Sequence, residues 1–172
     1  MTLENKRVLI LGANLFEDTE LLYPLHRLRE EEADVVVAGL DASPIHGKKG
    51  HGPLPVDTTV DAVRAGDFDA LVVPGGFQPD ALRRSAHALD LVRAFNEAGK
   101  PVAMICHAGW VGISAGILNG RKATSVGAIK DDMVNAGVEF VDDSVVVDGN
   151  LITSRHPGDL GPWMKALISA LS

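Results

Sequence analysis

Short runs of aliphatic residues alternate along the chain with longer segments in which apolar positions recur every three or four residues. The short runs are typical of strands buried on both faces, and the longer segments are typical of amphipathic helices. The pattern predicts core strands at residues 7–12, 34–38, 70–73 and 101–105. It predicts helices at residues 18–32, at 86–97, directly after residue 106 and at 157–171.

Two segments depart from this alternation. Residues 39–57 are rich in Gly, Pro, His and Lys, which predicts a loop or a small hairpin. The part from 46 to 52 has neither metal-ligand spacing nor a phosphate-binding pattern, so we expect it to be a solvated loop. Nearer the C-terminus, the apolar runs 145–148 and 151–153 flank Gly149-Asn150, which is a strong signal for a β-hairpin.

The alternation of strands and helices favours an α/β fold. In such a fold a mostly parallel central sheet is covered by helices on both faces, which gives a three-layer sandwich. The chain has 172 residues and shows no internal repeat and no linker. We therefore expect residues 1–172 to form a single domain.

The composition limits the classes of partner. Hydrophobic residues make up 46% of the chain and the formal net charge is −7, so a general nucleic-acid surface, which needs a basic face, is not expected. The N-terminal residues lack the apolar core of a signal peptide, and no apolar stretch is long enough to cross a bilayer. We expect a cytoplasmic protein with neither a nucleic acid nor a membrane as its partner.

The only cysteine, Cys106, lies where the strand at 101–105 ends and a helix begins. A sharp turn of this kind presents one side chain at the edge of a sheet, and a helix N-terminus favours a thiolate. The chain has no Cys-x-x-Cys, His-Glu-x-x-His or Gly-x-Gly-x-x-Gly pattern, so we expect no metal and no cofactor. Cys106 is a candidate nucleophile, although a buried cysteine that acts as a small apolar side chain is also common.

Two other predicted strands end in residues that could assist Cys106. Glu17 follows the first strand and Gly75-Gly76 follow the third, and the carboxyl ends of parallel strands meet at one edge. A protonated Glu17 would donate a hydrogen bond to the thiolate; alternatively, Glu17 only complements the start of a helix. The N–H groups of both glycines and of the residues after Cys106 could form an oxyanion hole, unless the glycines only make a tight turn.

Histidines near the same edge are candidate bases. His107 is adjacent to Cys106, but neighbouring side chains at a helix start diverge, so His107 needs an acid to orient it. Asp80 is the nearest candidate for that acid. His156, with Arg155 before it, follows the last predicted strand; it either approaches the site or is an ordinary histidine of a surface loop.

Several motifs are distributed over nearly the whole chain. They are Phe16-Glu17-Asp18-x-Glu20-Leu21-x-Tyr23-Pro24, Leu71-Val-Val-Pro74-Gly75-Gly76, Ile105-Cys106-His107, Gly120-Arg121-Lys122-Ala123-Thr124, Ile129-Lys130-Asp131-Asp132 and Val145-Val-Val-Asp148-Gly149-Asn150. Together they resemble the ThiJ/PfpI superfamily, in particular its intracellular-protease-I and general-stress branch. The resemblance implies a flavodoxin-like sandwich that works as a homodimer or higher homo-oligomer. It also implies a reactive cysteine that pairs with a protonated glutamate matching Glu17.

Two positions depart from the family pattern. The family sequence Cys-His-Gly-Pro-Gln reads Cys106-His107-Ala108-Gly109-Trp110 here. Ala108 and Trp110 are therefore candidate binding residues, and the substrate can differ from that of other family members. The acid that orients the family histidine is commonly a glutamate, often supplied by a neighbouring subunit. Asp80 occupies the matching position and is one methylene shorter.

The resemblance implies a stress-protective cysteine hydrolase. Its substrate would be a peptide, or a small carbonyl compound or glycated group if the protein is a glyoxalase or deglycase. The alternative is a redox-sensing stress protein or holdase chaperone, in which Cys106 is oxidised without catalytic turnover. No second cysteine is present to resolve a sulfenic acid within the chain.

Overall fold

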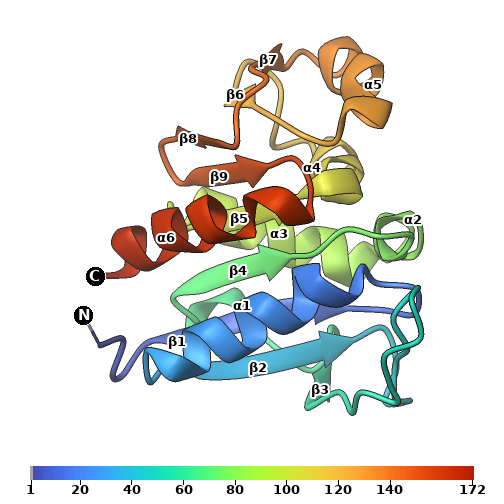
Figure 1. Ribbon diagram of the computed structural model, residues 1–172, viewed down its shortest axis with the longest axis vertical. Helices are drawn as coiled ribbons and strands as arrows, with labels where there is room; N and C mark the ends of the chain where they lie inside the picture. The colour runs from blue at the N-terminus through green and yellow to red at the C-terminus, as the bar shows by residue number, and fades with distance from the viewer. Residues whose placement is uncertain (1) are drawn as a thin grey trace.

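A seven-stranded sheet forms the centre of the computed structural model, which describes residues 2–172 (Figure 1). The strands stand in the order β3 (Thr58–Thr59), β2 (Asp34–Gly39), β1 (Arg7–Gly12), β4 (Ala70–Val73), β5 (Val102–Ile105), β9 (Leu151–Ser154) and β8 (Val145–Asp148). Only β8 is antiparallel to its neighbour in this sheet. Two further short strands, β6 (Lys122–Ala123) and β7 (Glu139–Phe140), pair with each other in parallel.

Helices cover both faces of the sheet, as the sequence predicts. They are α1 (Asp18–Glu30), α2 (Gln78–Leu82), α3 (Ala86–Glu97), α4 (Gly109–Ala115), α5 (Lys130–Asn135) and α6 (Leu160–Leu171). Figure 1 shows α1 and α6 in front of the sheet and α3 and α4 behind it. No helix within residues 2–172 is long and apolar enough to cross a membrane.

The alternation of side chains along β1 explains why this strand is apolar throughout. Val8 and Ile10 belong to the core cluster that contains the apolar faces of α1 and α6, and Leu9 and Leu11 belong to the cluster on the opposite face. All four side chains have no exposed surface. Because successive strand residues point to opposite faces, a central strand in a three-layer sandwich must be apolar at every position.

The predicted elements agree closely with the observed ones. The strands at 7–12 and 70–73 and the helix at 86–97 have the predicted bounds, and the 145–154 segment is the expected hairpin. The segment predicted as a helix from 157 begins instead with a 3₁₀ turn, Pro157–Asp159. The short elements β3, β6, β7, α2 and α5 were not predicted, because two to six residues carry too little periodicity to be recognised.

The order of the strands places a binding edge between β1 and β4. From β1 the chain runs outward through β2 and β3 and then returns to β4 on the other side of β1. Open α/β sheets bind ligands beyond the carboxyl ends of the strands at such a reversal. Three segments therefore meet at this edge: the ones that follow Gly12, Val73 and Ile105.

Candidate active site

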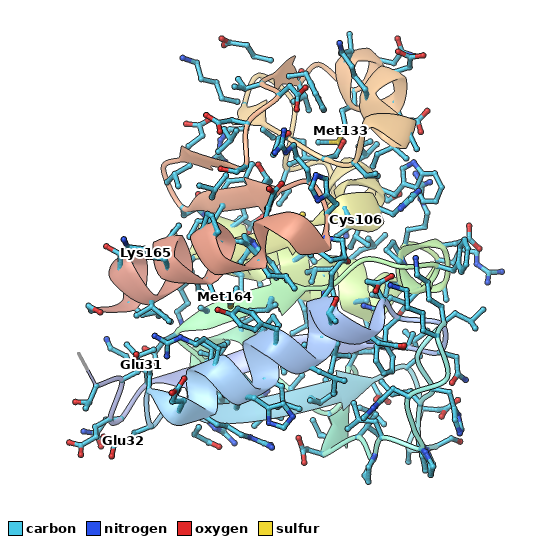
Figure 2. All side chains as sticks on the ribbon, viewed as in Figure 1. Glu31, Glu32, Cys106, Met133, Met164 and Lys165 are labelled. Atoms are coloured by element: carbon cyan, nitrogen blue, oxygen red, sulfur yellow. The ribbon has the colours of Figure 1, made fainter. Side chains whose placement is uncertain are left out.

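Cys106 occupies a strained turn at the carboxyl end of β5, at the edge where α1 begins (Figure 2). Its φ is +62°, in the left-handed region that residues with a side chain rarely adopt. Such a conformation costs on the order of 1–3 kcal/mol and persists only where the surroundings enforce it. The residue is 8% exposed, so only a small part of it contacts solvent. The turn predicted from the sequence is present.

The carboxyl group beside the sulfur belongs to Glu20, in the first turn of α1. Glu20 has no exposed surface, and its Oε2 accepts a hydrogen bond of 2.8 Å from the N–H of Gly75. The carboxyl group lies close enough to Cys106 for the two groups to influence each other's pKa. Its Oε1 is buried and has no hydrogen-bond partner among residues 2–172, which suits a carboxyl group that holds a proton.

Burial controls the ionisation of this pair. Burial, with a smaller contribution from the nearby negative charge of Glu17, raises the pKa of Glu20 to about 7. Burial also raises the pKa of the Cys106 thiol, to about 12, with an added contribution from an ionised Glu20. Both groups therefore resist ionising together, and the pair keeps at least one proton at neutral pH. When Glu20 holds that proton it carries no charge, so it no longer opposes ionisation of the Cys106 thiol.

The expectation that Glu17 is the protonated partner of Cys106 is wrong. Each oxygen of the Glu17 carboxylate forms an ion pair of 2.8 Å, one with Lys48 and the other with Lys49. Burial alone would raise the pKa of Glu17, but the hydrogen bonds from the two lysines outweigh it and lower the pKa. Glu17 is thus a carboxylate, and Glu20, three residues further along the same helix face, takes the role. The sequence signal was present, because Glu20 lies within the same family motif.

The glycine turn after β4 packs closely against the start of α1 and the end of β5. A Cβ on Gly75 would lie 2.5 Å from Oε2 of Glu20 and 2.7 Å from Cβ of Cys106, closer than real Cβ contacts allow. Gly76 has φ +86°, and its N–H and that of His107 both donate toward the sulfur of Cys106. The expected oxyanion hole is therefore available from Gly76 and His107. Gly75 does not contribute, since its N–H is bonded to Glu20.

His107 lies closer to the nucleophile than its sequence position suggested. Its Nδ1 is 3.3 Å from the sulfur of Cys106. Burial lowers the pKa of His107, and the charge of Lys48 lowers it further, so the ring is neutral at pH 7 and one nitrogen can accept a proton. Asp80 does not orient this ring within the chain, because its exposed carboxylate faces Arg84 at 4.0 Å.

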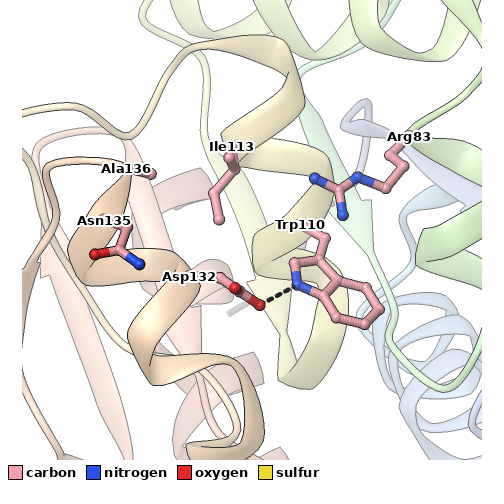
Figure 3. Close-up of a pocket in the computed structure, with 6 residues that line it drawn as sticks. All are labelled: Arg83, Trp110, Ile113, Asp132, Asn135 and Ala136. Atoms are coloured by element: carbon pink, nitrogen blue, oxygen red, sulfur yellow. Dashed lines mark hydrogen bonds between the residues drawn. The ribbon is translucent and has the colours of Figure 1, made fainter.

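Trp110 lies against His107 rather than over Cys106. The two rings are in edge contact with their centroids 5.2 Å apart, and the indole Nε1 donates to Asp132 at 2.8 Å (Figure 3). On its other side Trp110 lines a cavity of about 390 Å³ together with Arg83, whose guanidinium stacks over the indole. Cys106 is not part of that lining. Trp110 therefore stays a candidate binding residue, one that contacts His107 and lines the cavity beside Arg83.

The remaining candidate residues lie outside the contacts of Cys106. The side chain of Ala108 is fully buried in the core, so this residue offers only its backbone. Arg155 is held by Asp159 at 2.8 Å and Asp142 at 2.9 Å, and with His156 it lines a separate cavity of about 220 Å³. Within residues 2–172 no group of three or more His, Cys, Asp or Glu side chains could hold a metal ion.

Comparison with known proteins identifies one family over almost the full length. The model of the DJ-1/PfpI family matches residues 6–170. Deglycase PfpI from Pyrococcus furiosus is 50% identical over 165 residues, which is 96% of this chain and 99% of that protein. Protein/nucleic acid deglycase 2 from Escherichia coli is 40% identical over 169 residues, 97% of this chain and 98% of that protein.

A solved structure confirms the fold independently. A two-domain protein from Anabaena variabilis, with DJ-1/ThiJ/PfpI-like and ferritin-like domains, superposes with a TM-score of 0.96 at 42% identity. The match covers 97% of this chain and 48% of that protein, so this chain spans about half of its length. The α/β sandwich expected from the sequence is confirmed.

The shared proton leads to a prediction for the pH dependence of Cys106 alkylation by iodoacetamide. In the wild type the rate rises through an inflection near pH 7, where the pair loses its first proton and part of the population becomes thiolate with neutral Glu20. Glu20→Gln removes this inflection and leaves one step at the thiol's own pKa. Glu17→Gln keeps the inflection but moves it to lower pH, since Glu17 raises the pKa of Glu20. An inflection near pH 7 in Glu20→Gln would contradict the assignment.

The close approach at Gly75 gives a second prediction. Gly75→Ala forces Glu20 and Cys106 apart and destabilises the fold by about 1–3 kcal/mol, since the added methyl group meets packed atoms. Gly161→Ala is the control, because a Cβ at that helical position meets nothing within 4 Å. Thermal unfolding measures both effects, and the alkylation profile should lose its inflection only in Gly75→Ala. Equal melting temperatures for the two variants would refute the packing argument.

Proposed function

This chain belongs to the DJ-1/PfpI family, and we propose that it is a stress-protective cysteine hydrolase that acts as a deglycase or glyoxalase on reactive carbonyl groups. The observation that carries the proposal is the trio at the end of β5: a strained cysteine, a buried carboxyl group that shares its proton, and two N–H groups directed at the sulfur. This arrangement supplies a nucleophile, an acid and an oxyanion hole. A single thiol with no disulfide partner suits the reducing cytoplasm, where we place the protein.

The proposed reaction begins with attack on an aldehyde carbon. The Cys106 sulfur bonds to that carbon, the carbonyl oxygen takes the proton held by Glu20, and a hemithioacetal results. His107 then moves the proton from this carbon to the neighbouring keto carbon while the hydroxyl proton passes to the keto oxygen, which yields the thioester of a hydroxy acid. Water hydrolyses the thioester, releasing the acid and restoring the thiol. A glycated amine enters the same reaction by substitution: the sulfur bonds to the carbon that carries the amine, and the amine leaves with the proton of the thiol.

The narrow access to Cys106 supports small substrates. The sulfur belongs to a residue only 8% exposed, and neither the cavity beside Trp110 nor the one beside Arg155 includes it. A dicarbonyl or its adduct on an exposed side chain can enter such an opening. An extended peptide needs a groove, and these cavities provide none at the sulfur. We therefore favour carbonyl adducts over folded proteins as substrates.

Turnover of three substrates tests the proposal. Wild type and Cys106→Ser are incubated with methylglyoxal, a methylglyoxal-treated peptide and casein. We expect the wild type to act on the first two, and Cys106→Ser to lose more than about 10³-fold in kcat because the nucleophile is gone. No turnover by the wild type on any substrate, together with selective oxidation of Cys106 by peroxide, would favour the redox-sensing alternative instead.

We also propose that Asp80 orients His107 of a second copy in a homo-oligomer. Its side chain is 68% exposed and the family position it matches is often supplied in trans, so it is free to reach a neighbour. Asp80→Asn should lower kcat about 10- to 100-fold by leaving the base unoriented. Mixed oligomers of Asp80→Asn and Cys106→Ser then regain part of the activity, since some sites combine an intact cysteine with an intact acid. Activity that stays at the level of the separate variants would exclude the arrangement in trans.

A further inference from the structure

The loop before β3 is attached to the active site by backbone contacts. Gly47 forms a bridge with Phe16, and Phe16 forms another with Gly76. The N–H of Lys48 donates to the carbonyl of Phe16 at 2.8 Å. Since the N–H of Gly76 points to the sulfur, only one strand-like segment separates Lys48 from the oxyanion hole. The loop that the sequence predicts to be solvated therefore contacts a segment of the active site.

The side chain of Lys48 turns toward the catalytic groups. It is 29% exposed and its ammonium lies 5.4 Å from the centre of the Phe77 ring, which is itself 62% exposed. Its positive charge acts on Cys106, on Glu20 and on His107. A cation and an exposed aromatic ring thus stand together beside the opening to the sulfur.

The Glu17 carboxylate is paired with a second lysine, so it does not depend on Lys48 alone for its charge balance. Lys49 already supplies an ion pair of 2.8 Å to Oε1 of Glu17, and it does so from a side chain that is 63% exposed. Asp18 adds a negative charge nearby, and its carboxylate accepts a hydrogen bond of 3.0 Å from the backbone N–H of Lys49. The hydrogen bond to Glu17 raises the pKa of Lys48, so its ammonium stays charged at every pH of interest.

We propose that Lys48 is a specificity-determining residue that binds a carboxylate on the substrate while Cys106 attacks the carbonyl carbon. The inference rests on the proposed function and names its substrate class: carbonyl adducts that carry a carboxylate close to the reacting carbon, such as those formed on the thiol or amine of an amino acid. The ammonium pairs with the carboxylate, and the exposed face of Phe77 contacts the apolar part of the adduct. A neutral adduct of the same shape lacks the first of these contacts.

Alkylation with two reagents tests the site without any turnover. Iodoacetate and iodoacetamide have nearly the same shape, but only iodoacetate carries a carboxylate. In the wild type at low salt, we expect the iodoacetate-to-iodoacetamide rate ratio at Cys106 to exceed that of Lys48→Gln by about 10-fold, the effect of one partly desolvated charge pair. Added salt should shrink the difference. The iodoacetamide rate of each variant shows that its thiol is intact and the protein folded.

Matched variants distinguish a direct contact between Lys48 and the carboxylate of the reagent from a general effect of positive charge on the loop. Lys49→Gln removes the same charge from the same loop and the same Glu17 partner, and it should change the ratio less than about 2-fold because its exposed charge is screened. Lys48→Arg should restore most of the wild-type ratio. An unchanged ratio in Lys48→Gln, or an equal fall in Lys49→Gln, would overturn the assignment.

Turnover of a matched pair of adducts extends the test to catalysis. The hemithioacetals of methylglyoxal with N-acetylcysteine and with its amide differ only in the carboxylate. Because the charge of Lys48 also acts on Cys106, Glu20 and His107, both rates can change; we expect Lys48→Gln to lower kcat/KM about 10-fold more for the acid than for the amide, with the difference mainly in KM. If the wild type turns over neither adduct, the proposed function fails, whereas the alkylation ratio still decides whether Lys48 binds a carboxylate.

Discussion

A single proton shared between two buried acids is the constraint on which the site depends. Glu20 and Cys106 both lie out of water, so neither ionises easily and the two cannot do so together. The fold brings them together at the cost of a left-handed backbone at Cys106 and of any side chain at Gly75. Both constraints are local, and both occur where the neighbouring strands β4 and β5 end. The rest of the sandwich provides the rigid packing that holds this contact in place.

Two glutamates on one helix face illustrate how environment sets charge. Glu17 meets two lysines from a loop about thirty residues away and remains a carboxylate, whereas Glu20 meets a thiol and a peptide N–H and holds its proton near neutral pH. The residues are chemically identical and three positions apart. Their roles diverge because one faces a cationic loop and the other faces the interior, which is how enzymes obtain an acid and a fixed charge from the same residue type.

The sequence predicted the parts of this site that depend on local pattern. Buried strands and amphipathic helices have clear periods, so β1, β4, α3 and the elbow at Cys106 were found within a residue or two. The expectation that Glu17 is the protonated partner of Cys106 was wrong, because the charge of Glu17 depends on where Lys48 and Lys49 lie in space, and no periodicity encodes that. The same limit applies to Gly75, whose N–H is taken by Glu20, and to Trp110, whose ring turns toward His107.

The arrangement also explains how hydrolysis and oxidation can compete at one cysteine. The thiolate is the reactive form in both, and Glu20 with its proton favours that form in both. What separates them is the fate of the proton: addition to a carbonyl creates an oxyanion that takes it, whereas oxidation of the sulfur creates no basic oxygen on a substrate. The N–H groups of Gly76 and His107 stabilise such an oxyanion. The same N–H groups would also stabilise the oxygens of a sulfenate or sulfinate, so they do not separate the two functions. The proton held by Glu20 does separate them, because an alkoxide formed on a carbonyl needs that proton and a sulfinate does not, and this favours carbonyl chemistry at this edge of the sheet.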